Sequence, residues 1–163
     1  MHLPSPTPET TEALGAALAA ALDEAGAVVV LSGPLGAGKT RFVKGLASGL
    51  GIPAARVQSP TFVIAQELPR PGGGVLVHVD CYRVGSEAEL EAAGLLDWLA
   101  PGALVVAEWG ERVPGAWPED RLEIVFSRVG EGRALDARAL GGAAALLERW
   151  RRSAATISPA PAS

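Results

Sequence analysis

The stretch AVVVLSGPLGAGKT, residues 27–40, contains three successive patterns that together indicate the fold class. Its first five residues form an unbroken apolar run, typical of a strand that is buried on both faces of a sheet. A glycine-rich segment follows. The pattern of residues 39–50 then predicts a helix that ends before Gly51 and Pro53. A buried strand, a glycine loop and a helix in this order predict an α/β domain.

The glycine-rich segment, residues 33–40, matches the pattern G-x-x-x-x-G-K-[ST]. Gly36 and Gly38 allow the backbone to curl, so that its N–H groups point at phosphate oxygens. The following helix adds its positive N-terminal end. In this pattern Lys39 reaches the β- and γ-phosphates, and the Thr40 hydroxyl is a hard oxygen ligand for Mg²⁺. The segment therefore predicts binding of a nucleoside triphosphate as its magnesium complex.

The rest of the chain predicts a single P-loop NTPase-type α/β domain with a mixed, mainly parallel sheet flanked by helices. Further helices are expected at residues 8–25 with Thr7 as N-cap, at 87–93 after a capping box, and at 142–152. Further strands are expected at residues 62–68 and 75–80, which form an antiparallel hairpin, and at 103–108, 122–127 and 133–139. Residues 1–7 are Pro-rich and expected to be loose. The domain is expected to span residues 1–152, and residues 153–163 a disordered tail.

Composition excludes several classes of protein. The chain has 163 residues, 48% of them apolar and 20% charged, as in a globular domain. A net charge of −4 argues against a protein that grips nucleic acid through a basic surface. Cys81 is the one cysteine, so no internal disulfide is possible. The sequence shows no signal-peptide pattern and no apolar run of the about 18 residues that a membrane helix needs. We therefore expect a cytoplasmic protein without a membrane partner.

Two acidic residues follow apolar strands, where ligands collect in open α/β sheets. Asp80 ends one strand and Glu108 another. One acid is expected to bind the metal, directly or through water, and the other to orient or deprotonate an attacking water. Which acid does which stays open. Trp109 follows Glu108 directly, and Thr61 in a Ser-Pro-Thr turn has a position that suits contact with a γ-phosphate.

The choice of nucleotide follows from lysine usage. Guanine-specific switch proteins read the base with an Asn-Lys-x-Asp motif, whereas Lys39 and Lys44 are the two lysines here and neither lies in that motif. ATP is therefore favoured over GTP. A small-molecule or nucleotide kinase remains an alternative, although residues 97–112 contain a single arginine and make a poor lid. A third hypothesis is that the protein is a non-catalytic binding module that responds to ATP.

Four motifs occur in an order that resembles the TsaE family, also called YjeE. They are the phosphate loop at 33–40, SPTF at 59–62, HVDCYR at 78–83 and EWGE at 108–111. The resemblance covers about residues 8–150. It implies a P-loop ATPase that assists synthesis of threonylcarbamoyladenosine beside the tRNA anticodon. The resemblance implies that TsaD carries out the transfer with its partner TsaB, that this chain docks on that pair, and that its hydrolysis is weak without the partners. With its negative net charge, we expect the chain to reach tRNA only indirectly, through the complex.

The resemblance also implies roles for individual residues. Thr40 and Glu108 are expected to ligate Mg²⁺, and Asp80, Glu108 and Thr61 to be catalytic. Glu9–Thr11 are expected near the adenine. The residues expected to contact the nucleotide are Leu35, Gly36, Ala37, Gly38, Lys39, Thr40, Trp109 and Arg133.

Overall fold

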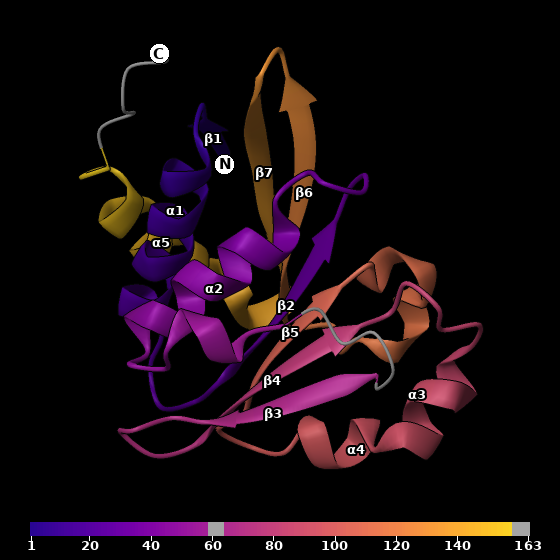
Figure 1. Ribbon diagram of the computed structural model, residues 1–163. Helices are drawn as coiled ribbons and strands as arrows, with labels where there is room; N and C mark the ends of the chain where they lie inside the picture. The colour runs from indigo at the N-terminus through magenta and orange to yellow at the C-terminus, as the bar shows by residue number, and fades with distance from the viewer. Residues whose placement is uncertain (59–63, 158–163) are drawn as a thin grey trace.

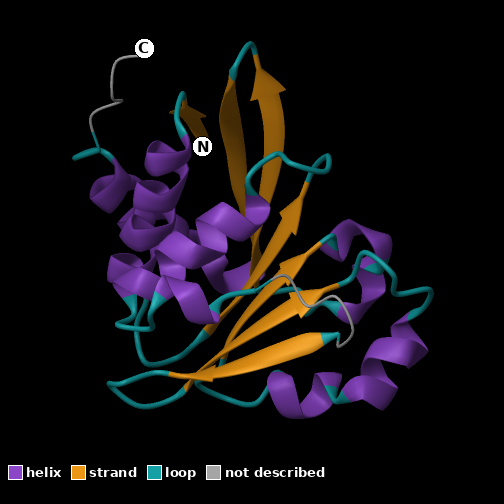
Figure 2. Cartoon of the chain, in the orientation of Figure 1, coloured by secondary structure: helices purple, strands orange, loops and turns teal. Residues whose placement is uncertain are grey.

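The computed structural model describes residues 1–58 and 64–157, which form one sheet between two groups of helices (Figures 1 and 2). The strands are β1 (His2–Ser5), β2 (Ala27–Ser32), β3 (Ala65–Pro69), β4 (Val75–Asp80), β5 (Leu104–Glu108), β6 (Arg121–Val129) and β7 (Gly132–Leu140). The α-helices are α1 (Pro8–Ala21), α2 (Lys39–Gly49), α3 (Glu87–Ala93), α4 (Leu95–Trp98) and α5 (Ala144–Ala154). The short 3₁₀ turns are η1 (Ala54–Arg56), η2 (Gly110–Arg112), η3 (Pro114–Ala116) and η4 (Gly141–Ala143). Within the described ranges no helix combines the length and the apolar character that a bilayer crossing requires.

The seven strands lie in the order β1-β7-β6-β2-β5-β4-β3. β2 pairs in parallel with β5 and with β6, and β4 pairs in parallel with β5. β7 and β3 run antiparallel to their neighbours. The sheet is therefore mixed and mainly parallel, as the sequence predicted. The parallel register places Leu31 opposite Glu108, and Glu108 opposite Asp80, so that three strands end at the same edge.

The larger part of the core lies between one face of the sheet and α1, α2 and α5 (Figure 1). Phe42 of α2 packs edge-on against both Phe126 of β6 and Trp150 of α5, with ring centroids 5.8 Å apart in each pair. Such edge-to-face contacts add to the apolar area that each ring buries. A smaller cluster on the other face includes Val77, Trp98 and Trp117. The two clusters fix the sheet between its helical layers.

The N-terminal residues differ from the expectation of a loose segment. His2–Ser5 form β1, which pairs antiparallel with β7, and the terminal amine of Met1 donates to the carbonyl of Ala137. The prolines in this segment suggested irregular structure, but proline is tolerated in an edge strand, where one row of backbone groups needs no partner. β1 is such an edge strand, so the prediction for residues 1–7 was wrong.

Several predicted elements also differ from those in the structure. α1 ends at Ala21, short of the predicted residue 25. The turn α4 was not predicted. α5 continues to Ala154, past the predicted start of the tail at residue 153. Residues 158–163 lie outside the described part of the chain, so the predicted tail stays a prediction.

Two glycines set how closely α1 approaches α2, the helix that follows the phosphate loop. A Cβ built on Gly45 would lie 1.9 Å from the carbonyl oxygen of Glu12. One built on Gly15 would lie 2.2 Å from the carbonyl oxygen of Phe42. Both atoms are backbone and have little room to move, so the two helices touch directly through their main chains.

We therefore expect Gly45→Ala to destabilise the protein, although alanine has the higher helix propensity. Overpacking of this kind costs about 1–3 kcal/mol, measured as a lower free energy of unfolding in urea. Gly72→Ala is the control, because a Cβ at Gly72 meets nothing within 4 Å. Equal stability of the Gly45→Ala variant and the wild type would contradict this packing.

Candidate functional site

The loop between β2 and α2 has the backbone conformation that a phosphate loop requires. Gly33, Gly36 and Gly38 have φ angles of 122°, 74° and 104°, a region that side chains disfavour. α2 begins at Lys39, and Gly38 as its N-cap has no side chain to bind the first N–H groups of the helix. These N–H groups and the positive end of α2 are therefore available to an anion.

Lys39 lies over this loop and is almost fully buried, at 4% exposure. Its Nζ donates to the carbonyl of Gly33 at 2.6 Å and to that of Pro34 at 3.1 Å, and it lies 3.7 Å from the centroid of the Trp109 ring. Burial lowers the pKa of Lys39, while the nearby acids Glu108, Glu111 and Asp80 raise it. A bound polyphosphate would further favour the charged ammonium.

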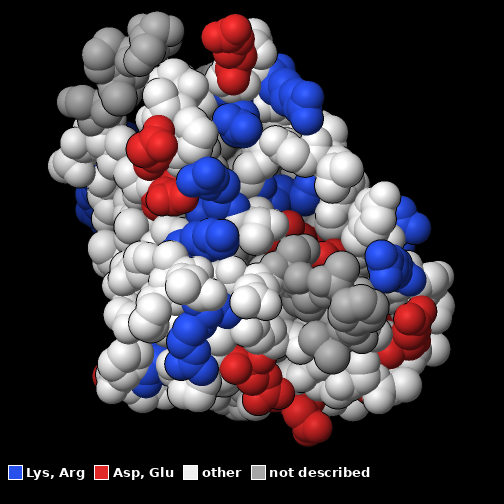
Figure 3. All heavy atoms as spheres, in the orientation of Figure 1, with Lys and Arg blue, Asp and Glu red and all other residues white. Residues whose placement is uncertain are grey.

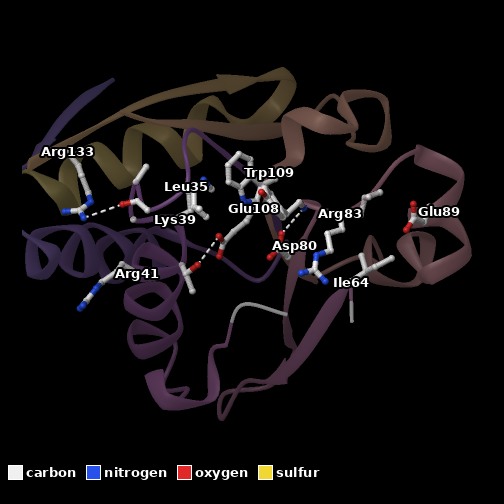
Figure 4. Close-up of a pocket in the computed structure, with 16 residues that line it drawn as sticks. Leu35, Lys39, Arg41, Ile64, Asp80, Arg83, Glu89, Glu108, Trp109 and Arg133 are labelled. Atoms are coloured by element: carbon white, nitrogen blue, oxygen red, sulfur yellow. Dashed lines mark hydrogen bonds between the residues drawn. The ribbon is translucent and has the colours of Figure 1, made fainter. Parts of the chain in front are cut away.

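Glu108 is buried at the end of β5 and uses both carboxylate oxygens. Oε2 accepts a hydrogen bond of 3.0 Å from the hydroxyl of Thr40, the second residue of α2. Oε1 lies 2.8 Å from Nε2 of His78. Asp80 lies opposite Glu108 in the β4–β5 register, and its Oδ1 accepts the backbone N–H of Tyr82 at 2.9 Å. The two predicted strand-end acids thus lie beside the predicted phosphate loop (Figure 4).

A cavity of about 660 Å³ opens between these groups, within the range of small-ligand sites. Figure 3 shows Lys and Arg atoms bordering the hollow and acidic atoms within it. Of the predicted site, Asp80, Glu108, Trp109, Arg133 and the loop residues Leu35, Gly36, Ala37, Gly38, Lys39 and Thr40 line it. Thr61 lies outside the described residues. Glu9–Thr11 are not among the described residues that line the cavity.

Two arginines from the β6–β7 hairpin contact the phosphate loop. Of these, Arg133 was predicted from the sequence and Arg128 was not. Arg128 and Arg133 face each other in the hairpin register. Nη2 of Arg128 donates to the carbonyl of Leu35 at 2.9 Å, and Nη2 of Arg133 donates to that of Gly36 at 3.5 Å. Arg128 is separated from Leu35 by 93 residues and lies in no motif, so no local pattern marked it.

Trp109 has a strained backbone. Its φ of 59° is the one positive φ outside glycine within the described residues. Its ring contacts Lys39 and lies 5.0 Å, centroid to centroid, from the ring of Tyr82, another cavity residue. Strain of this kind costs of order 1–3 kcal/mol and concentrates at functional sites. The conformation orients the indole ring toward the phosphate loop. Ile64, Arg83 and Glu89 also line the cavity and were not predicted as site residues.

The available ligands suit magnesium better than a metal that needs a cage of protein side chains. The Thr40 hydroxyl and the Glu108 carboxylate are hard oxygen donors in direct contact. Across the described residues, no group of three or more His, Cys, Asp or Glu side chains gathers as a metal cluster. Mg²⁺ in nucleotide sites typically takes one or two protein ligands and completes its shell with phosphate oxygens and water. This donor set therefore fits Mg²⁺ that arrives with a polyphosphate.

Comparison with known proteins identifies the family. The family model described as "Threonylcarbamoyl adenosine biosynthesis protein TsaE" matches residues 5–135. The chain belongs to the TsaE family. The resemblance seen in the sequence motifs is thereby confirmed.

Individual TsaE relatives match most of the chain. The tRNA threonylcarbamoyladenosine biosynthesis protein TsaE of Streptomyces coelicolor is 45% identical over 139 residues, covering 84% of this chain and 91% of the relative. The protein of the same name from Bacillus subtilis is 43% identical over 124 residues, covering 76% and 75%. The crystal structure of Bacillus subtilis YdiB matches with a TM-score of 0.74 and 34% identity, covering 93% of this chain and 94% of that chain. The fold is thus that of a solved TsaE relative.

Cys81 follows Asp80 directly but has no access to solvent, at 0% exposure. Burial, with the adjacent charge of Asp80, raises the pKa of its thiol to about 12. The thiolate is the reactive form of cysteine, and the raised pKa disfavours it at pH 8. The burial of Cys81 therefore argues against a role as a nucleophile.

We expect native protein at pH 8 to resist alkylation by iodoacetamide, and urea-unfolded protein to react as a free thiol of pKa about 8.5. Because the folded pKa is the higher one, the thiol's contribution to stability is present below about pH 8.5 and decreases as the pH rises toward 12. Mass spectrometry of labelled protein gives the extent, with Cys81→Ser as the unlabelled control. Rapid stoichiometric labelling of native protein would contradict the burial.

Proposed function

We propose that this TsaE protein is a Mg²⁺-dependent ATPase that acts with TsaD and TsaB in the synthesis of tRNA threonylcarbamoyladenosine. The observation that carries the proposal is the direct contact between Thr40 of the phosphate loop and Glu108 at the end of β5. In this proposal the contact brings together the phosphate loop and the carboxylate that a metal–triphosphate site requires. The names of the Streptomyces coelicolor and Bacillus subtilis relatives support this pathway.

The chemistry of hydrolysis follows from the arrangement of charges. In this proposal the loop N–H groups and Lys39 bind the phosphates. Thr40 and Glu108 would hold Mg²⁺, which would supply positive charge against the charge that develops on the phosphate oxygens. Asp80 orients the attacking water and accepts its proton. The water oxygen forms a bond to the γ-phosphorus as the bond to the β–γ bridging oxygen breaks, giving ADP and phosphate.

ATP is proposed over GTP because neither of the two lysines lies in an Asn-Lys-x-Asp motif. A protein partner is proposed over direct tRNA binding because the chain has a net charge of −4. Proteins that bind nucleic acid themselves neutralise backbone phosphates with clustered Lys and Arg, and an acidic chain is poorly suited to this. tRNA would thus be reached indirectly, through the complex.

The central test is ATP hydrolysis with and without partners. Wild-type protein is expected to hydrolyse ATP slowly in Mg²⁺ and faster with TsaD and TsaB. Asp80→Asn is expected to bind ATP within about threefold of wild type but to lose about 10²–10⁴-fold in hydrolysis, because the proton acceptor is removed. Phosphate release and calorimetric binding measure the two effects separately.

Two results would contradict the proposal. One is a hydrolysis rate that does not change when TsaD and TsaB are added. The other is transfer of the γ-phosphate to a small-molecule acceptor in the absence of partners, which would indicate a kinase. Lys39→Ala serves as the control for specific binding, because loss of the ammonium removes a phosphate contact.

The contact between Arg128 and the phosphate loop gives a second test. Arg128→Ala is expected to weaken ATP binding by about fivefold, because losing an exposed charge-assisted hydrogen bond costs about 1 kcal/mol. Arg138→Ala is the matched control: Arg138 lies on the same hairpin but pairs with Glu123, away from the cavity. Equal ATP affinities in the two variants would show that Arg128 does not support the loop.

A further inference from the structure

His78 is a polar residue placed in an apolar part of the sheet. It lies in the middle of β4 with no exposure to solvent, and it faces Val106 of β5 in the parallel register. Leu76 and Val106 belong to the large apolar core. Burying a polar side chain is unfavourable unless hydrogen bonds replace its contacts with water. Packing alone therefore does not explain why a histidine lies at this position.

The hydrogen bonds of the ring are unequal. Nε2 lies 2.8 Å from Oε1 of Glu108. A carboxylate only accepts hydrogen bonds, so the proton of this bond belongs to Nε2. Nδ1 is buried and has no hydrogen-bond partner within residues 1–58 and 64–157. A neutral ring with its proton on Nε2 satisfies Glu108 and leaves no buried N–H without an acceptor. Among the described residues, the ring therefore bonds on one side, toward Glu108.

This bond fixes the orientation of the Glu108 carboxylate. With Oε1 bonded to His78, Oε2 is the oxygen that meets the Thr40 hydroxyl at 3.0 Å. Glu108 is 3% exposed, so little water is available to replace either partner. The His78 ring comes from β4, the Thr40 hydroxyl from α2, and the carboxylate from β5 between them. Three elements therefore determine where Oε2 points.

We propose that His78 is a positioning residue that orients Glu108 so that Oε2 and the Thr40 hydroxyl together bind Mg²⁺. The inference rests on the proposed function, in which Glu108 is a metal ligand. His78 touches neither metal nor nucleotide and acts through Glu108 alone. Such outer partners typically change metal affinity or activity by 10–100-fold when they are removed.

Calorimetric binding of a non-hydrolysable ATP analogue to the full chain, with Mg²⁺ varied or removed by EDTA, tests this role. His78→Leu is expected to raise the half-saturating Mg²⁺ concentration by about 10–100-fold. The EDTA affinity is expected to stay within about threefold of wild type, because the phosphate loop itself is intact. The separation of these two readouts distinguishes metal positioning from a general loss of structure.

A pair of amide variants keeps the test valid if the leucine variant does not fold. The glutamine of His78→Gln can place an N–H near the position of Nε2, whereas the shorter asparagine of His78→Asn places it near Nδ1. His78→Gln is therefore expected to stay within about threefold of wild type in its Mg²⁺ requirement, and His78→Asn to resemble His78→Leu. Equal Mg²⁺ requirements in the two amide variants would overturn the proposal.

Two controls separate the possible causes. Val106→Ala removes apolar contact next to His78 without removing a hydrogen bond. It is expected to lower the urea midpoint and leave the Mg²⁺ requirement unchanged. In a Glu108→Gln background, His78→Leu is expected to cause no further rise in that requirement, because the effect passes through the carboxylate. A full additional effect in that background would overturn the proposal.

The Mg²⁺ dependence of analogue binding by the wild type distinguishes a failure of the proposed function from a failure of the role of His78. If analogue binding by wild type does not depend on Mg²⁺, the metal assignment and the role of His78 both fail. If wild type depends on Mg²⁺ and His78→Leu requires the same concentration, only the role of His78 fails.

Discussion

The parallel pairing of β5 with β2 on one side and β4 on the other is the constraint on which the site depends. β2 leads into the phosphate loop, β5 ends in Glu108, and β4 ends in Asp80. Because parallel strands end at the same edge, both acids come to lie beside a loop that is distant in sequence. The glycines of that loop and the close contact of α1 with α2 then fix where α2 begins. A shift of one residue in the β5 register would direct Glu108 to the other face of the sheet.

The cavity combines buried groups of opposite charge. Lys39 loses most of its solvent, and Glu108, Glu111 and Asp80 compensate for part of that loss. The backbone carbonyls and the Trp109 ring provide further contacts for the ammonium. In the proposed function, phosphates would bind on the side of Lys39 and the loop N–H groups, and the cation on the side of the carboxylates. In that proposal the positive and negative groups of the site are already separated before any ligand arrives.

Features with a local cause were predictable from sequence. The glycine loop, the buried strand before it and the acids at strand ends follow from backbone freedom and apolar runs, and the structure has the predicted mixed sheet. β1 was missed because Pro4 lies within it and because its partner, β7, lies at the other end of the chain. The contacts of Arg128 with Leu35 and of His78 with Glu108 depend on strand order, which no local pattern contains. His78 is completely buried in β4, and the carboxylate that bonds its Nε2 lies 30 residues further along the chain.

A crystal structure with a non-hydrolysable ATP analogue and Mn²⁺ in place of Mg²⁺ would locate both the triphosphate and, by anomalous scattering, the metal. We expect the triphosphate within the loop at residues 33–40, with the metal at a ligand distance of about 2.0–2.2 Å from the Thr40 hydroxyl and a Glu108 oxygen. A triphosphate bound elsewhere, or a metal that contacts neither Thr40 nor Glu108, would contradict this expectation.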